Sequence, residues 1–135
     1  MDRRTFLAAT GVGATAALAG CFGTGLADSE FDVEMLSNRF EPEELEVSVG
    51  DTVVWGNTGS RGHSVTAYED GLPAGADYFA SGGFETESAA RDGYPEGNVP
   101  SGETYEYTFE TPGEYPYFCI PHERAGMVGT IVVRE

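Results

Sequence analysis

Alternating apolar and polar residues run along the chain from about residue 31 onward and predict short β-strands. Residues 104–110, TYEYTFE, give the clearest alternation: Tyr105, Tyr107 and Phe109 share one face, and threonines and glutamates share the other. Successive side chains of a strand point to opposite faces of its sheet. One face of this strand is therefore expected to be buried and the other to meet water.

A second alternation is followed by a turn signal. In LEVSVGDTVVWGN, which begins at Leu45, apolar residues occupy every second position before a Gly-Asp pair, and an apolar run ending at Trp55 comes next. Two strands joined by a short turn of this kind are typical of a β-hairpin.

Four further segments are strand candidates: residues 31–36, 63–68, 114–120 and 126–134. Residues 69–102 are rich in Gly, Pro, Asp and Ser and predict a long excursion, with one helical turn near 86–91 and no chemistry assigned to it. About seven to eight short strands separated by turn signals predict an all-β fold, an antiparallel two-sheet sandwich of Greek-key type. A chain of 135 residues is too short for two ordinary domains, so residues 31–135 are expected to form one domain.

The charge narrows the possible partners. The chain has 23 acidic and 7 basic residues, a net charge of −16, and all of its basic residues other than histidine are arginine. Such a surface repels nucleic acid and anionic lipid head groups, which excludes both as direct partners of the bare surface. The acidic residues are spread along the chain, which resembles proteins of salt-loving archaea.

The first residues resemble an export signal. Arg3-Arg4 followed by Phe6-Leu7 is similar to a twin-arginine (Tat) signal, which directs export of folded proteins. The apolar stretch at residues 6–20 is rich in Ala, Gly and Thr, and it is shorter than the roughly 20 strongly apolar residues of a membrane-spanning helix. An export signal is therefore the better interpretation.

A lipobox-like motif, LAGC, closes this stretch at Cys21. Cleavage before Cys21 would leave that cysteine lipid-modified at the new amino terminus. We therefore expect residues 1–20 to be a Tat-type lipoprotein signal peptide and residues 21–30 a flexible tether. The domain is expected on the extracytoplasmic face of the cell membrane, held by its lipid. Cys119 is then the one remaining cysteine, which leaves no disulfide.

The sequence YPYFCIPHERAGM places three metal-binding side chains close together between two predicted strands. Cys119, His122 and Met127 offer a thiolate, an imidazole and a thioether, a soft set that suits copper as Cu(I) and as Cu(II). The chain has one other histidine, His63, at the start of a predicted strand. His63 would complete a trigonal site of two histidines and a cysteine, with Met127 as a weak axial ligand.

Other interpretations of these residues remain open at this point. Each residue alone is more often structural: a surface or core histidine, a core methionine, a small buried cysteine. Zinc held by Cys119, His63, His122 and a carboxylate such as Glu123 is a competing metal site, although zinc sites rarely use a thioether.

The sequences YFCIPHERAGMVGTIVV and GHSVTAYED resemble the plastocyanin branch of the cupredoxins, and most closely the halocyanins of halophilic archaea. The resemblance covers residues from about 31 to the end. It implies one type 1 copper site with His63, Cys119 and His122 as strong ligands and Met127 as the long axial ligand. Ser64 stands where plant-type members have an asparagine near the thiolate, which implies a weaker contact there. Phe118 stands where many members carry a tyrosine used as a second electron route.

The expected function is one-electron transfer, and the protein is expected not to be an enzyme. Four protein ligands leave no open position for a substrate, and both histidines are committed to the metal. Its partners would be redox proteins of a membrane electron-transport chain, and the carrier is expected to be a monomer. A copper-delivery or copper-storage protein is the alternative, and a domain of a copper oxidase is a third possibility.

Overall fold

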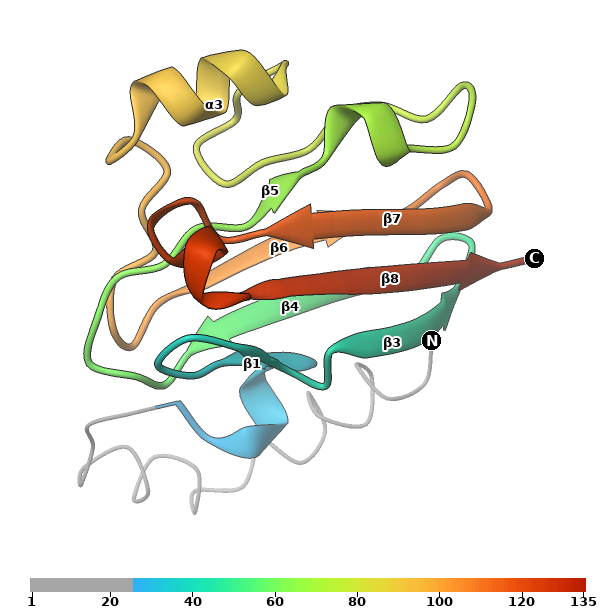
Figure 1. Cartoon of the computed structure of the whole chain (residues 1–135). Helices are drawn as coiled ribbons and strands as arrows, with labels where there is room; N and C mark the ends of the chain where they lie inside the picture. Colours follow the sequence, from blue (N-terminus) through green and yellow to red (C-terminus); the bar gives the residue numbers. More distant parts are fainter. Residues whose placement is uncertain (1–25) are drawn as a thin grey trace.

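The computed structural model describes residues 26–135, which form a sandwich of two four-stranded sheets (Figure 1). The predictions for the signal peptide, for Cys21 and for most of the tether fall on residues outside this range. The first sheet has the order β2-β1-β4-β6, and the second has the order β3-β8-β7-β5. The strands are β1 (Val33–Met35), β2 (Phe40–Glu41), β3 (Glu44–Ser48), β4 (Thr52–Asn57), β5 (Thr66–Ala67), β6 (Thr104–Thr108), β7 (Gly113–Phe118) and β8 (Val128–Arg134).

The all-β sandwich is confirmed, but two details of the predicted topology are wrong. β3 and β4 do not pair as a hairpin: β3 pairs with β8, and β4 pairs with β1 and β6 in the other sheet. The turn between them is a corner from one sheet to the other, which exposes Val49. The sandwich is also not wholly antiparallel, because β1 runs parallel to β4 and β3 runs parallel to β8.

The alternation in residues 104–110 does place one face toward the core. Phe109 is fully buried, Tyr105 and Tyr107 are partly buried, and the intervening Glu106 is exposed. Trp55 on β4 lies at the centre of the core and meets Tyr117 of the second sheet edge-on, with ring centroids 5.4 Å apart. The aromatic core thus joins the two sheets into one unit that carries the loops at its end.

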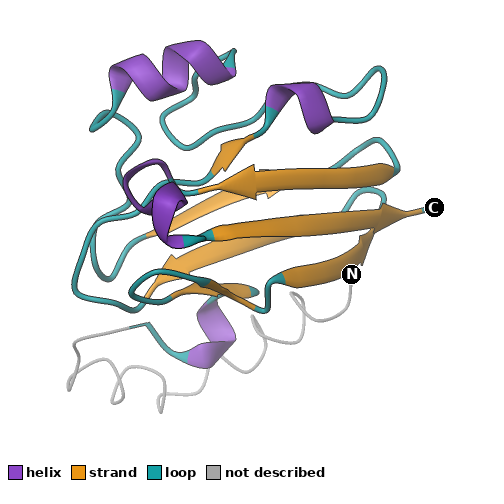
Figure 2. Ribbon diagram, in the orientation of Figure 1, coloured by secondary structure: helices purple, strands orange, loops and turns teal. Residues whose placement is uncertain are grey.

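The excursion between β5 and β6 lies beyond the β5 edge of the second sheet (Figures 1 and 2). It contains a short 3-10 helix, η2 (Glu69–Gly71), and the helix α3 (Glu87–Gly93). The helical turn expected near residues 86–91 is therefore confirmed. Thr86 is the N-cap of α3, and its hydroxyl accepts a hydrogen bond from the Ala89 amide at 3.0 Å.

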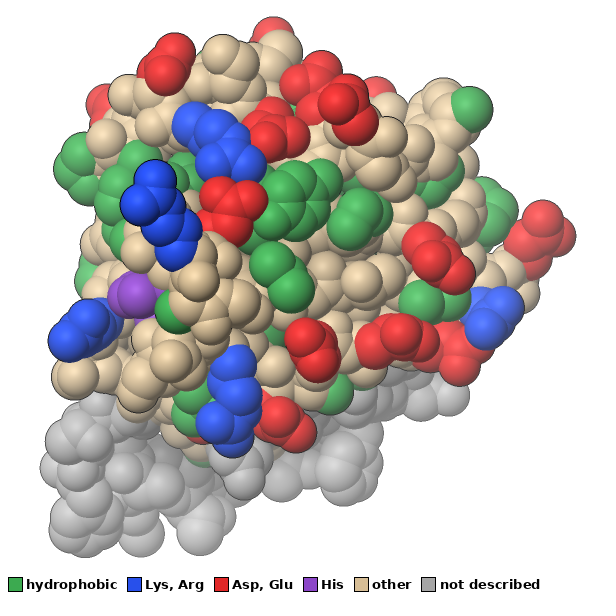
Figure 3. All heavy atoms as spheres, in the orientation of Figure 1, with side chains coloured by type: hydrophobic (Ala, Val, Ile, Leu, Met, Phe, Trp, Pro, Cys, Tyr) green, Lys and Arg blue, Asp and Glu red, His purple; other side chains and the backbone are tan. Residues whose placement is uncertain are grey.

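Acidic side chains are spread across the face seen in Figure 3 and do not gather in one tail or patch. This distribution matches the spread of Asp and Glu along the sequence. Within residues 26–135, no helix has the length and apolar character needed to cross a membrane.

Candidate metal centre

The ligand loop, residues 119–127, joins β7 to β8 at one end of the sandwich (Figure 1). Most of it forms the 3-10 helix η3 (Ile120–Ala125), and Gly126 then turns the chain back with φ 92°. This left-handed conformation favours glycine, which has no Cβ to clash. The Cys119 amide donates to the Met127 carbonyl at 3.1 Å, and the Met127 amide donates to the His122 carbonyl at 3.2 Å. The backbone thus brings the three predicted ligands of this loop close together.

His63 reaches the same place from the segment before β5. Its backbone exchanges two hydrogen bonds with Val99: the His63 amide donates at 3.2 Å and the His63 carbonyl accepts at 2.7 Å. The buried Asn57 side chain donates to the carbonyls of Val99 and Arg61, at 2.9 and 2.7 Å. These bonds fix the backbone on both sides of His63, so the direction of its ring is set by the fold.

Three donor atoms converge where the two segments meet. The Nδ1 atoms of His63 and His122 are 3.1 Å apart, and the Sγ atom of Cys119 lies 3.6 Å from the first and 3.4 Å from the second. His63 and Cys119 have no exposed surface, and His122 is partly exposed. A proton on one nitrogen would satisfy one of these contacts, whereas a single cation would satisfy all three donors at once. The donor set therefore fits a soft metal ion such as copper.

Burial controls the protonation of these groups. It lowers the pKa of His63 to about 4, helped by the nearby His122, and it also lowers the pKa of His122. Burial raises the pKa of the Cys119 thiol, while hydrogen bonds from Ser64 and His122 act in the opposite direction. Both imidazoles are thus neutral at ordinary pH and ready to bind a metal, and a bound cation would displace the thiol proton. The Nε2 atom of His63 is buried without a hydrogen bond of ordinary geometry.

Ser64 contacts both the sulfur and the ligand loop. Its backbone amide donates to Cys119 Sγ at 3.4 Å, and its hydroxyl accepts from the Ile120 amide at 2.9 Å and lies 3.0 Å from Thr66 Oγ1. The contact near the thiolate that the family resemblance implied is therefore present: the Ser64 amide makes the stronger bond, and the Ser64 side chain adds a weaker one that also lowers the pKa of the thiol. The side chain also fixes the first residue of η3 through the bond from the Ile120 amide.

Met127 has no exposed surface and belongs to the same buried cluster as Cys119. It follows Gly126 directly and precedes β8, so its backbone is held between the ligand loop and the sheet. Met127 thus lies buried directly beside the loop that carries Cys119 and His122.

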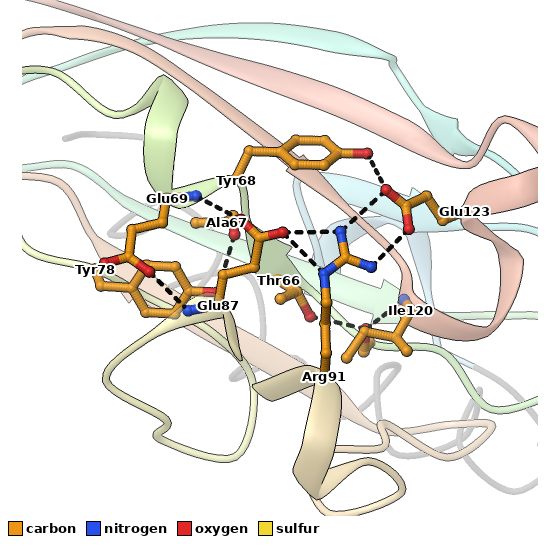
Figure 4. Close-up of polar contacts among 10 residues, drawn as sticks. Thr66, Ala67, Tyr68, Glu69, Tyr78, Glu87, Arg91, Ile120 and Glu123 are labelled. Carbon is orange, nitrogen blue, oxygen red and sulfur yellow. Dashed lines mark hydrogen bonds and ion pairs between the residues drawn. The ribbon is translucent and has the colours of Figure 1, made fainter. Parts of the chain in front are cut away.

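Glu123, the carboxylate considered as a fourth zinc ligand, is bound to other side chains. Glu123 accepts hydrogen bonds from Arg91 Nη1 and Nη2, at 2.8 and 3.2 Å, and from the Tyr68 hydroxyl at 2.6 Å (Figure 4). The Arg91 guanidinium, more than any other neighbour, lowers the pKa of this carboxyl. Among the described residues, the cluster of potential metal-binding groups contains His63, Cys119 and His122, and no carboxylate joins it.

Arg91 was not expected near the site, because residues 69–102 had no chemistry assigned to them. Helix α3 nevertheless places its guanidinium against the ligand loop, with Cζ 4.2 Å from the centre of the Phe118 ring. No periodicity or motif in the sequence indicates this contact, since it depends on how the excursion folds back over β5.

Comparison with known proteins gives the same picture. Residues 27–134 match the family of copper binding proteins described as plastocyanin/azurin. The chloroplastic plastocyanin of Tetradesmus obliquus is 39% identical over 95 residues, which cover 70% of this chain and 58% of that protein. The plastocyanin of Scenedesmus fuscus is also 39% identical over 95 residues, covering 70% of this chain and 86% of that protein.

A solved structure of a reduced amicyanin variant superposes with a TM-score of 0.57 at 28% identity, covering 81% of this chain and 86% of that one. The chain spans less than two thirds of the Tetradesmus protein but most of the Scenedesmus one. The matched region contains both sheets and all the converging donors. From its fold, its donor set and these matches, the chain belongs to the plastocyanin/azurin family of copper-binding proteins.

Proposed function

We propose that this protein is a blue copper electron carrier attached to the outer face of a cell membrane. His63, Cys119, His122 and Met127 would hold the copper. The observation that carries the proposal is the convergence of two imidazole nitrogens and one sulfur within 4.8 Å of one another at the end of a rigid sandwich. The copper, when bound, supplies one-electron exchange between Cu(I) and Cu(II).

The protein keeps the ligands in place between the two oxidation states. Val99 and Asn57 fix the backbone around His63, and the bonds within the ligand loop fix Cys119 and His122. Electron transfer is faster when the ligands move little between the two oxidation states, because the reorganisation energy is then lower. With four protein ligands, the site has no position for a substrate, which favours electron transfer over hydrolysis.

We propose that electrons pass at the partly exposed edge of His122. Its chain neighbour Pro121 is exposed and carries no charge. Ile120, Ala125 and Gly62 carry none either, while Arg61 lies close enough to lower the pKa of His122. A redox partner that docks on uncharged residues such as Pro121 does not have to remove water from carboxylates. The partners would be redox proteins of a membrane electron-transport chain, met by a monomeric carrier.

Copper delivery or storage is the alternative function. A protein that releases copper needs accessible ligands, whereas His63, Cys119 and Met127 have no exposed surface. We expect the copper-loaded protein to pass through repeated chemical oxidation and reduction as a one-electron couple, with its copper retained in the presence of a competing chelator. Loss of copper to the chelator in each reduced cycle would instead support delivery.

The membrane anchor is proposed from the motif that ends at Cys21. Replacing Cys21→Ser should leave the protein without a lipid, because the modified residue would be absent. Mass spectrometry of the mature amino terminus and fractionation of the cells measure this directly. Membrane-bound wild-type protein with an unmodified Cys21 would contradict the proposal.

A further inference from the structure

Helix α3 brings a cation from the excursion to the ligand loop. The Arg91 guanidinium meets the Glu123 carboxylate with two parallel hydrogen bonds, Nη1 to Oε1 at 2.8 Å and Nη2 to Oε2 at 3.2 Å (Figure 4). Paired bonds of this kind fix both the distance and the plane of the two groups. The carboxylate of Glu123 is therefore held in one orientation by a residue from a distant part of the chain.

The same guanidinium also lies over an aromatic ring. Its Cζ atom is 4.2 Å from the centroid of Phe118, the residue just before Cys119. Glu123 is the residue just after His122. One side chain thus contacts the chain neighbours of two proposed ligands, although it touches neither ligand itself.

Tyr68 completes this contact region. Its ring stacks on Phe118 with centroids 4.4 Å apart at 29°, and its hydroxyl donates to Glu123 Oε2 at 2.6 Å. We call Arg91, Glu123, Phe118 and Tyr68 the clasp. The Phe118 side chain, which Arg91 and Tyr68 cover, has no exposed surface.

The helix that carries Arg91 is itself held to the body of the protein. Glu87 accepts from Arg91 Nε at 2.8 Å and from the Glu69 amide at 2.9 Å, while Glu69 accepts from the Glu87 amide at 3.1 Å (Figure 4). Glu69 follows Tyr68 directly, so both sides of the clasp are joined through η2. Arg91 therefore approaches the ligand loop from a fixed support.

The ion pair between Arg91 and Glu123 is only partly shielded from water. The side chains of Arg91 and Glu123 are 38% and 29% exposed. An isolated ion pair that water reaches contributes little to the free energy of unfolding, whereas a pair with two parallel bonds in a network contributes more. The geometry of Arg91 and Glu123, two parallel hydrogen bonds plus a stacked ring, restricts position more than it adds energy.

We propose that Arg91 is a positioning residue for the copper site, which holds the ligand loop through Glu123 and Phe118 so that Cys119 and His122 keep one geometry in both oxidation states. This role rests on the electron-transfer function proposed above. It gives the excursion, which carries no ligand, a part in the reaction.

The test compares Arg91→Lys and Arg91→Gln with the wild type. Lysine keeps the positive charge but cannot form two parallel bonds or lie flat on a ring. In the copper-free proteins, hydrogen exchange at the amides of His122, Gly126 and Met127, which close the loop, should be several-fold faster in both variants. In the copper-loaded proteins, the Cu(II) electron paramagnetic resonance lines should broaden. Moving reacting groups by about 1 Å can slow a reaction roughly 10²-fold. A loosened loop moves the ligands by less, so the rate of electron self-exchange should fall by about threefold to tenfold.

Arg134→Gln is the matched control. It removes the same charge from an ion pair with Glu46 at the far end of β8 and should change none of these readings.

Glu123→Gln should repeat the effect of the Arg91 variants, and it carries the test if Arg91→Gln does not fold. Arg91→Lys behaving as wild type would overturn the proposal, because charge alone would then suffice. Arg91 variants that lose thermal stability but match the control in hydrogen exchange and line width would also overturn it. Wild-type protein without a blue band would instead refute the proposed function, while the copper-free exchange would still test the clasp.

Discussion

The Met127 side chain is fully buried beside Cys119, where a polar replacement must find a partner or remain unsatisfied. If Met127 is the axial ligand, Met127→Gln offers copper a harder oxygen that favours Cu(II). The reduction potential should then fall while the blue colour largely survives. A tenfold gain in preference for Cu(II) corresponds to about 59 mV for a one-electron couple, so a decrease of about this size is expected. Voltammetry of both proteins measures it, and an unchanged potential would mean that Met127 does not bind the metal.

Residue types and spacing predicted the converging donors. Cys119, His122 and Met127 lie in one short turn between two strands, which keeps their side chains near one another. His63 could be predicted because the chain has only two histidines. The stronger contact made by Ser64 could not be predicted from its residue type, since the backbone amide donates it to the sulfur and the side chain contributes less. The contact of Arg91 with the ligand loop could not be predicted, because its partners Phe118 and Glu123 lie far away in sequence.

At the scale of elements, the ligand loop offers two possible exits for an electron. Pro121 is exposed beside His122, whereas Phe118 is buried beneath Tyr68 and Arg91. Pro121→Glu should slow electron exchange with a redox partner, because a charge placed there must lose water when the partner docks. Its visible spectrum should remain nearly intact. Phe118→Leu removes the ring that Arg91 and Tyr68 contact, so it should slow the exchange by no more than Arg91→Gln does and by less than Pro121→Glu does.

Stopped-flow rates with a redox partner check this order. Pro112→Glu is the control, since it adds the same charge at an exposed proline before the other end of β7. Equal rates in Pro121→Glu and wild type, or a larger effect from Phe118→Leu, would exclude the His122 edge. A distorted spectrum in Pro121→Glu would mean that Pro121 mainly shapes the loop.

Strand positions were predicted better than strand partners. The pattern that begins at Leu45 contains two strands, β3 and β4, but they belong to different sheets. Periodicity reports which face of a strand is apolar, and this holds equally for a hairpin and for a corner between sheets. β2 was missed because two residues, Phe40 and Glu41, are too short a segment to show any period.

At the scale of the whole molecule, the net charge of −16 makes the fold sensitive to salt. The Debye length grows from about 3 Å at 1 M salt to about 30 Å at 0.01 M, so repulsion between carboxylates acts over more of the surface. Lowering the salt should therefore lower the midpoint of thermal unfolding, by about 5 °C or more. Calorimetry across a sodium chloride series measures this, with an uncharged osmolyte as control. A midpoint that does not move with salt would contradict adaptation to high salt.

The visible spectrum of the copper-loaded protein tests the central claim most directly. A thiolate bound to Cu(II) in a trigonal site should give an intense blue charge-transfer band that disappears on reduction. Cys119→Ser removes the sulfur and should abolish the band, while His63 and His122 can still bind copper. Wild-type protein that is colourless when loaded with copper, or a Cys119→Ser variant that is equally blue, would contradict the assignment of this site.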